Sequence, residues 1–281
     1  MNRIAILTDS SADLTNEQLK EYNIDVIRMP INIDGVDYLD EIEIDYDTFV
    51  DKMKNNSICK TSQPRLGEFK EKVDQLLKEY DVVLSIPISK GLSGTYNSIL
   101  TLSKEYNDKL IVIDSNHIAC LLGDLCIQTR MLLNKGKTPL EIKELIERDS
   151  YMWTCILPDD LIYLKRGGRI STVSALLGNL IKLVPLLVIE HGVFNLYSKV
   201  RTYNKAIQTL LDITKDLKNP SNYNWYVAHA ACEDKAIEIA KELKDIVKQD
   251  IKISKLGSVI MSHTGPNTVG IGYVKKIGKC N

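Results

Sequence analysis

Short apolar runs alternate with stretches of helical periodicity along the first half of the chain. The stretch 66–80 carries apolar residues at helical spacing, and Thr15 with Gln18 predicts a capping box that opens another helix. The apolar runs end in polar residues, as buried strands do where they lead into loops, and Asp34-Gly35 predicts a small hairpin. The runs are residues 3–7, 82–86 and 110–113. This alternation predicts a three-layer α/β/α domain with a mainly parallel sheet.

The pattern changes after Pro139, which is a favourable first residue of a helix. An apolar strand at 153–157 is followed by two short helical stretches and by a hairpin over 188–200. A helix after Thr202, a strand, a helix over 234–247 and two terminal strands complete the pattern. This second region predicts a two-layer α/β domain with a mixed sheet.

The length of the chain also points to two domains. A chain of 281 residues exceeds the usual size of one domain, yet no stretch rich in Pro, Gly and Ser separates independent modules. We therefore expect two closely packed domains, residues 1–150 and residues 151–281.

Charge and composition narrow the classes of function. The chain carries 36 Lys and Arg against 37 Asp and Glu, so no bulk positive field is available to hold nucleic acid or an anionic membrane. Three Phe residues supply few stacking platforms for bases, although the thirteen Tyr residues leave that point open. We expect no nucleic-acid partner.

The cysteines and the first residues suggest a cytoplasmic protein. The six cysteines form no C-x-x-C pair, and no histidine stands at zinc-finger spacing, so we expect no metal site. The apolar run at 3–7 is too short for a signal peptide or a membrane span. We expect reduced thiols and a cytoplasmic location.

Four polar clusters follow predicted strands or precede predicted helices, where open α/β sheets bind their ligands. Taken singly, each cluster is at least as typical of turns and helix caps, and His263 of an ordinary buried histidine. The clusters are Thr8-Asp9-Ser10-Ser11, Thr61-Ser62-Gln63-Pro64, Ser93-Gly94-Thr95 and His263-Thr264-Gly265-Pro266.

Together with further residues, these clusters resemble the signatures of the DegV family in their order along the chain. The added residues are Leu92 and Tyr96 around the third cluster, the run Leu161-Ile162-Tyr163-Leu164-Lys165-Arg166-Gly167-Gly168-Arg169-Ile170, and Gly270 after the fourth cluster. The resemblance covers the whole chain. It departs from the family after Asp114-Ser115, where Cys120-Leu121-Leu122-Gly123 stands in place of a Ser and small glycines, which leaves the width of the pocket open.

The resemblance implies a carrier without chemistry of its own that binds one long-chain fatty acid and needs no cofactor. The acyl tail would lie in a tunnel between the domains, and a partner fatty acid kinase would phosphorylate the carboxylate to an acyl-phosphate. The implied carboxylate-binding residues are Thr61, Ser93, Gly94 and His263, with Asp9, Ser10, Ser11 and Ser62 as a supporting polar loop. Arg169 and Arg201 would lie on a basic surface near the opening, where the kinase docks.

Physical chemistry permits such a site. A buried carboxylate needs hydrogen-bond donors, and two hydroxyls, an imidazole and the amides near Gly94 would supply them without a permanent buried cation. Burial of roughly fourteen methylenes at about 0.8 kcal/mol each would contribute about 11 kcal/mol before ordering costs, so the tail should dominate affinity. The apolar candidates for the tunnel wall, each more typical of ordinary core, are residues 118–119, 121–122, 175–177 and 180–181.

Two enzyme readings remain as alternatives. A lipid or acyl-ester hydrolase would use Ser93 as nucleophile and His263 as base, but no G-x-S-x-G elbow surrounds Ser93. A nucleotide-binding enzyme is the weakest reading, because both G-x-G-x-x-G and G-x-x-x-x-G-K-[ST] are missing from the sequence. Transient membrane contact is plausible for a fatty-acid carrier, although no long basic amphipathic helix supports it.

Overall fold

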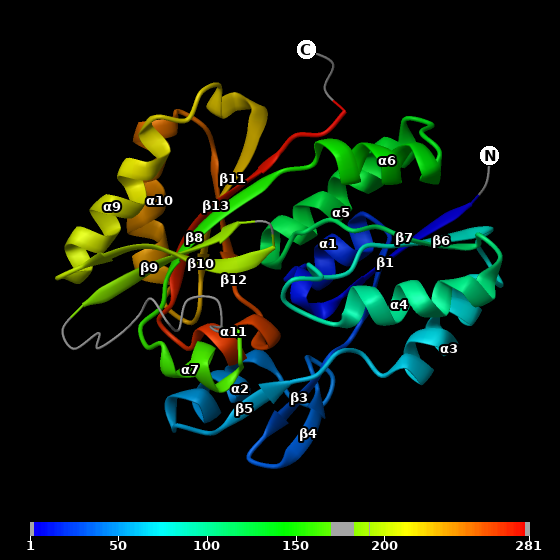
Figure 1. Cartoon of the computed structure of the whole chain (residues 1–281), viewed down its shortest axis with the longest axis horizontal. Helices are drawn as coiled ribbons and strands as arrows, with labels where there is room; N and C mark the ends of the chain where they lie inside the picture. Colours follow the sequence, from blue (N-terminus) through cyan, green and yellow to red (C-terminus); the bar gives the residue numbers. More distant parts are fainter. Residues whose placement is uncertain (1–2, 170–182, 191, 279–281) are drawn as a thin grey trace.

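The computed structural model describes residues 3–169, 183–190 and 192–278. Its first sheet is parallel throughout, with strand order β2-β1-β6-β7. Alternate residues of β1 face opposite layers: Ala5 and Leu7 pack with α3 and α4, whereas Ile6 packs with α5. The predicted three-layer α/β/α domain is therefore confirmed (Figure 1). Its strands are β1 (Ile4–Asp9), β2 (Ile24–Ile27), β6 (Val82–Ser85) and β7 (Leu110–Val112). Its helices are α1 (Asn16–Glu21), α3 (Leu66–Leu76), α4 (Thr95–Ser103), α5 (Ala119–Asn134) and α6 (Pro139–Asp149).

Local signals placed several of these helices correctly. Thr15 and Gln18 form the predicted capping box at α1, and Pro139 is the first residue of α6. The helix predicted over 66–80 ends at Leu76, because the chain turns there toward β6. Short 3₁₀ segments lie at Ser10–Ala12, Lys104–Tyr106 and Pro220–Asn222.

A small antiparallel sheet projects from the first domain at the bottom of Figure 1. It contains the hairpin predicted at Asp34-Gly35, and its third strand ends at Thr61. Its strands are β3 (Pro30–Ile33), β4 (Val36–Leu39) and β5 (Cys59–Thr61), and α2 (Tyr46–Lys54) joins β4 to β5. Pairing of Ile31 with Thr61 fixes the end of β5.

The second half of the chain forms a mixed sheet of order β10-β9-β8-β13-β11-β12, as predicted. One face packs on α9 and α10 in a core that includes Trp225 and Leu210. The other face, with Ile156 and Tyr226, packs toward α5 of the first domain (Figure 1). The strands are β8 (Met152–Leu157), β9 (Val184–Glu190), β10 (Val193–Val200), β11 (Tyr223–His229), β12 (Ile251–Lys255) and β13 (Val269–Lys275). The helices are α7 (Ile162–Arg166), α9 (Tyr203–Lys215), α10 (Glu233–Val247) and α11 (Ser258–Thr264).

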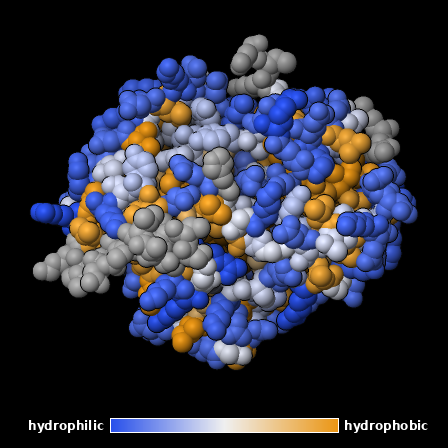
Figure 2. Space-filling view, in the orientation of Figure 1, coloured by the Kyte–Doolittle hydropathy of each residue, from blue (hydrophilic) through white to orange (hydrophobic). Residues whose placement is uncertain are grey.

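The largest core cluster therefore runs across the junction between the two sheets, because α5 has buried residues on nearly all sides. In the space-filling view, hydrophobic side chains are scattered among hydrophilic ones (Figure 2). No helix within the described ranges is long and apolar enough to cross a membrane.

Candidate functional site

Thr61 and His263 meet at the centre of the candidate site. Thr61 is the last residue of β5, and His263 lies in the last turn of α11, 202 residues further along. The Thr61 Oγ1 and His263 Nε2 atoms are hydrogen-bonded at 2.7 Å. Two residues from opposite ends of the chain thus present a hydroxyl and an imidazole side by side.

His263 is held neutral by its surroundings. Burial, and then the nearby Arg169 guanidinium, lower the pKa of the imidazole to about 4. Its Nδ1 atom is buried without a hydrogen-bond partner among the described residues. The backbone of Gly167 packs so closely that an added Cβ would lie 2.0 Å from Nδ1, so only glycine fits beside this ring. At neutral pH the ring offers one donor and one acceptor, not a cation.

Ser93 lies where the chain enters α4. Its Oγ is hydrogen-bonded to Thr95 Oγ1 at 2.8 Å and accepts from the Thr95 N–H at 3.3 Å. Gly94 is the N-cap of α4 and lies against the Gln63 side chain. Ser93 therefore sits beside the first free amides of a helix, a position that favours an anion.

A narrow cavity of about 40 Å³ brings Thr61, Ser93 and His263 together, and we call it the head cavity. Ser62, another predicted site residue, also lines it, whereas Gly94 is not among its lining residues. The remaining lining residues are Met29, Ile88, Leu92, Ile118, Arg169, Phe194, Val259, Ile260 and Thr264.

Arg169, which the resemblance implies on a basic surface near the opening, brings a cation to this wall. Its side chain is half-buried, and it donates from Nε to the Leu92 carbonyl at 3.1 Å and from Nη1 to the Gly167 carbonyl at 2.7 Å. The motif contains several basic residues, and only the fold shows which of them turns inward. Arg201, in contrast, is exposed directly after β10 and does not line the head cavity.

Asp9 and Ser10 of the predicted polar loop form hydrogen bonds with two residues that line the head cavity. Asp9 accepts the Ile88 N–H at 2.9 Å on Oδ2, and its Oδ1 accepts both the N–H and the hydroxyl of Ser11. The hydroxyl of Ser10 accepts the Met29 N–H at 3.1 Å. Asp9, Ser10 and Ser11 do not line the head cavity themselves, but their hydrogen bonds position Ile88 and Met29, which do.

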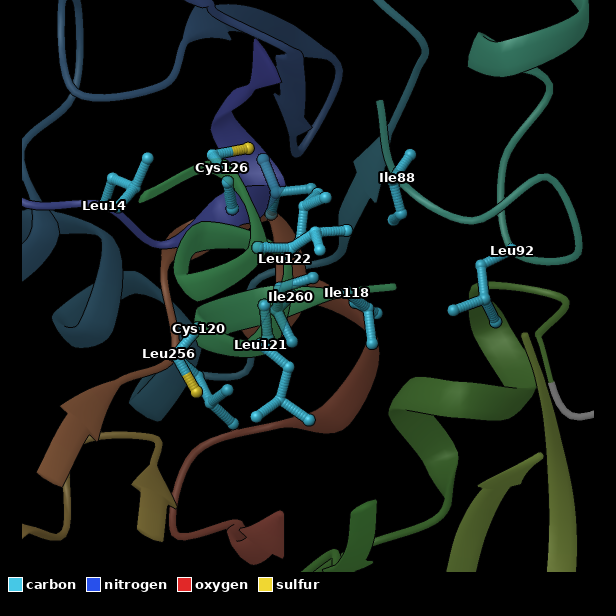
Figure 3. Close-up of a cluster of buried hydrophobic side chains, with 14 of the residues drawn as sticks. Leu14, Ile88, Leu92, Ile118, Cys120, Leu121, Leu122, Cys126, Leu256 and Ile260 are labelled. Atoms are coloured by element: carbon cyan, nitrogen blue, oxygen red, sulfur yellow. The ribbon is translucent and has the colours of Figure 1, made fainter. Parts of the chain in front are cut away.

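A second narrow cavity of about 40 Å³ continues from the head cavity between α5 and the mixed sheet. The two share Ile118, Phe194, Ile260 and Thr264, so we treat them as one tunnel and call the second part the tail cavity. Figure 3 shows Ile118, Leu121 and Ile260 between Leu92 on one side and Leu256 with Cys120 on the other. The further lining residues are Ala119, Cys120, Leu121, Thr154, Ile156, Ile189, Tyr226, Ala228, Leu256 and Gly272.

Two glycines of β13 leave space beside the sheet, and Gly272 leaves it toward α5. Gly270 and Gly272 lie on the same face of the strand, because side chains alternate along it. A Cβ on Gly272 would lie 3.0 Å from Leu121 Cδ1, and one on Gly270 would lie 2.8 Å from the Ile156 side chain. Alternating glycines in an apolar strand are the one sequence signal that indicates the tunnel floor.

The predicted tail-facing residues have different outcomes. Ile118, Ala119 and Leu121 line the tail cavity, but Leu122 points into the core and does not. Residues 175–177 and 180–181 lie outside the described residues. Met29, Phe194, Ile260 and Tyr226 were not singled out from the sequence, because nothing in their spacing distinguishes them from ordinary core.

Among the described residues, Ser93 and His263 are not paired as nucleophile and base. No hydrogen bond joins Ser93 to His263 within the ranges that the structure describes, and each is bonded to a threonine instead. No carboxylate of the described residues accepts a hydrogen bond from the His263 Nδ1 to orient the ring, unlike the arrangement at the base of a catalytic triad. The described residues also contain no group of three or more His, Cys, Asp or Glu side chains that could hold a metal ion.

A polar pocket that opens into a narrow apolar tunnel defines a receptor for an amphipathic molecule with an extended tail. The model of the DegV family, described as "Uncharacterised protein, DegV family", matches residues 3–276. The chain belongs to this family.

Relatives match over essentially their full length. A DegV domain-containing protein of Staphylococcus aureus is 33% identical over 281 residues, covering 98% of this chain and 100% of the relative. The structure of DegV from Bacillus subtilis, described as a fatty acid binding protein, superposes with a TM-score of 0.88 at 30% identity, covering 98% and 100% of the two chains. A fatty acid binding DegV family protein of Streptococcus agalactiae gives a TM-score of 0.88 at 31% identity, with the same coverage.

Proposed function

We propose that this protein binds a single long-chain fatty acid in the tunnel between a domain of residues 1–150 and a domain of residues 151–281. The carboxylate would lie in the head cavity and the acyl tail in the tail cavity. The observation that carries the proposal is the Thr61 and His263 pair at 2.7 Å, set at the polar end of a cavity that becomes apolar toward α5. Related proteins described as fatty acid binding support it.

The polar end has the donors that a carboxylate needs. The hydroxyls of Thr61 and Ser93 can donate, His263 carries one N–H, and the α4 amides near Gly94 add a positive dipole end. Arg169 on the same wall compensates the negative charge, although it is already hydrogen-bonded to two carbonyls. A cation that is partly satisfied elsewhere holds an anion less tightly than a free one, which favours reversible binding.

We further propose that the protein carries out no chemistry on the acid but presents its carboxylate to a separate kinase. The kinase would transfer the terminal phosphoryl group of a nucleoside triphosphate to a carboxylate oxygen, with cleavage of its bond to the adjacent phosphate, and release an acyl-phosphate and the nucleoside diphosphate. Arg169 at the cavity wall and the exposed Arg201 would form the docking surface, because a guanidinium suits contacts with phosphate or carboxylate groups. We also propose that the tunnel is loaded during transient contact with a membrane, where free fatty acid resides.

The first test is mass spectrometry of lipid extracted from the purified, denatured protein, with an unrelated protein from the same host as control. One equivalent of a long-chain acid is the expected result. An empty extract, together with failure to bind added acid, would reject the proposal. A measurable turnover of acyl esters that disappears in Ser93→Ala would instead support the hydrolase reading.

A further inference from the structure

The far end of the tail cavity meets a second, polar opening. A cleft of about 690 Å³ lies between the η1–α1 region of the first domain and β12 of the second. This cleft and the tail cavity have two lining residues in common, Cys120 and Tyr226. The side chains of these two residues therefore separate the apolar tunnel from a solvent-filled space.

Tyr226 is fixed in this position by a buried polar network. Its hydroxyl donates to Asp124 Oδ1 at 2.5 Å and accepts from Lys252 Nζ at 3.0 Å. The Lys252 ammonium also lies 5.1 Å from the centre of the Tyr226 ring. Tyr226 is 6% exposed and Asp124 is 2% exposed, so the hydroxyl and the carboxylate are both buried and both hydrogen-bonded.

Asp124 is held from the other side as well. Asn224 Nδ2 donates to it at 2.9 Å and Gln128 Nε2 at 2.6 Å. Gln128 also accepts the Ile277 N–H at 2.7 Å, which ties α5 to the end of β13. The network thus clamps α5 onto the sheet at the point where the tail cavity stops.

The register of the sheet shows why the cavity stops there. Tyr226, Gly272 and Thr154 form one row across β11, β13 and β8, and all three line the tail cavity. The next row consists of Asn224, Val274 and Met152, which do not line it. Between these two rows the gap between sheet and helix closes.

We propose that Tyr226 is the end stop of the acyl tunnel and sets the longest unbranched chain that the protein accepts. This inference rests on the proposed function, because it assumes that the tail cavity holds an acyl chain. Asp124 is a positioning residue that holds the ring through the hydroxyl. A chain that exceeds the tunnel must either displace the ring or leave methylenes in the head cavity.

The test is the affinity for a series of saturated acids that differ by one methylene, measured by calorimetry on delipidated protein. Each methylene buried in the tunnel should tighten binding about fourfold. Once the tunnel is full, further methylenes should bring no gain, and we call the chain length at which the gain ceases the break. Tyr226→Ala should move this break to longer acids, because the tunnel then opens into the cleft. Tyr226→Phe, which keeps the ring, should leave the break within one carbon of its original position.

Two further variants separate tunnel shape from stability. Tyr223→Ala makes the same chemical change on the opposite face of β11, against Tyr273, and should leave the break where it is. Gly272 pairs with Tyr226 across the sheet, and Gly272→Ala places a methyl group 3.0 Å from Leu121 inside the tail cavity. This variant should move the break to shorter acids. The Tyr226→Ala fold should survive, because Asp124 keeps donors from Asn224, Gln128 and Lys252.

The outcomes distinguish the two proposals. If the delipidated parent protein binds none of the acids, the proposed function fails. If it binds them with a clear break that stays in place in both Tyr226→Ala and Gly272→Ala, the fatty-acid function stands and the end stop is wrong. Opposite shifts in these two variants, with an unchanged break in Tyr223→Ala, would establish it.

Discussion

The carboxylate of Asp9 holds the backbone of Ile88, 79 residues further along the chain, through a hydrogen bond of 2.9 Å. Asp9 lies at the end of β1, and Ile88 belongs to the loop that leads from β6 to Ser93. Burial raises the pKa of Asp9, and the hydrogen bonds from Ser11 and Ile88 partly offset that cost. A residue of the predicted supporting polar loop thus shapes the wall of the head cavity.

Replacement of this carboxylate should weaken both the fold and the site. In Asp9→Ala the buried Ile88 and Ser11 N–H groups lose their acceptor, so we expect a loss of about 2 kcal/mol or more in the free energy of unfolding. The affinity for fatty acid should also fall, because Ile88, which lines the head cavity, loses the hydrogen bond that positions it. Chemical denaturation and calorimetry measure the two effects. Asp81→Ala, which removes an exposed carboxylate bonded to the Arg3 N–H, is the matched control and should change neither quantity appreciably.

Thr61→Ala should weaken acid binding while the fold survives. The change removes one donor to the carboxylate and leaves the His263 Nε2 without its partner, which we expect to cost about five- to tenfold in affinity. Thr61→Ser should restore most of the loss, because it retains the hydroxyl. Thr101→Ala, on the exposed side of α4, is the control. Equal affinity in Thr61→Ala and Thr101→Ala would remove Thr61 from the site.

Arg201→Ala should separate binding from use by the kinase. Because Arg201 is exposed and away from the head cavity, the affinity for acid should stay within about twofold. In an assay that combines the loaded protein with the kinase, the rate of acyl-phosphate formation should fall when the concentration of the loaded protein is below saturation. Arg148→Ala, an equally exposed arginine on α6, should leave that rate unchanged. A parallel loss of acid affinity in Arg201→Ala would contradict a docking role.

The buried carboxyl of Asp40 should make stability depend on pH. Burial, and then the charge of Glu41, raise its pKa from 3.8 to about 6. The folded state therefore binds this proton more tightly than the unfolded state does, so its contribution to stability is present below pH 4 and is lost as pH rises toward 6. At 1.36 kcal/mol per pKa unit, the loss is about 3 kcal/mol.

Asp40→Asn should consequently be more stable than the parent protein at pH 7 and show little or no gain at pH 4, as measured by urea denaturation at both values. The difference between variant and parent matters here, because His263, with a pKa lowered to about 4, has the opposite dependence. Asp37→Asn, exposed on β4, is the control. An Asp40→Asn variant that is less stable at both pH values would contradict the prediction.

Local signals predicted much of the fold. The capping box at Thr15, the Pro139 helix start and the Asp34-Gly35 hairpin depend on residues close in sequence, and the structure contains all three. The small sheet was predicted only in part, because β5 joins β3 across an intervening helix that leaves no short-range signal.

The site was harder to predict, because its geometry depends on the register of distant strands. The polar residues Thr61, Ser93 and His263 were found as members of a set of motifs, and the structure brings them to one cavity. Tyr226 and Phe194 are apolar or amphipathic residues in ordinary strands, and only their pairing across the sheet places them on the tunnel. Arg169 was expected near the opening, but its place on the cavity wall depends on the fold, since sequence does not show which arginine of a loop turns inward.

The separation of Thr61 and His263 by 202 residues also has a consequence during synthesis. At about 5 to 20 residues per second, the ribosome delivers His263 roughly 10 to 40 s after Thr61. The parallel sheet and the Ser93 loop can fold in that interval, but the imidazole that completes the pocket is still untranslated. The proposed carboxylate site between Thr61 and His263 therefore cannot form in a nascent chain until α11 has left the exit tunnel.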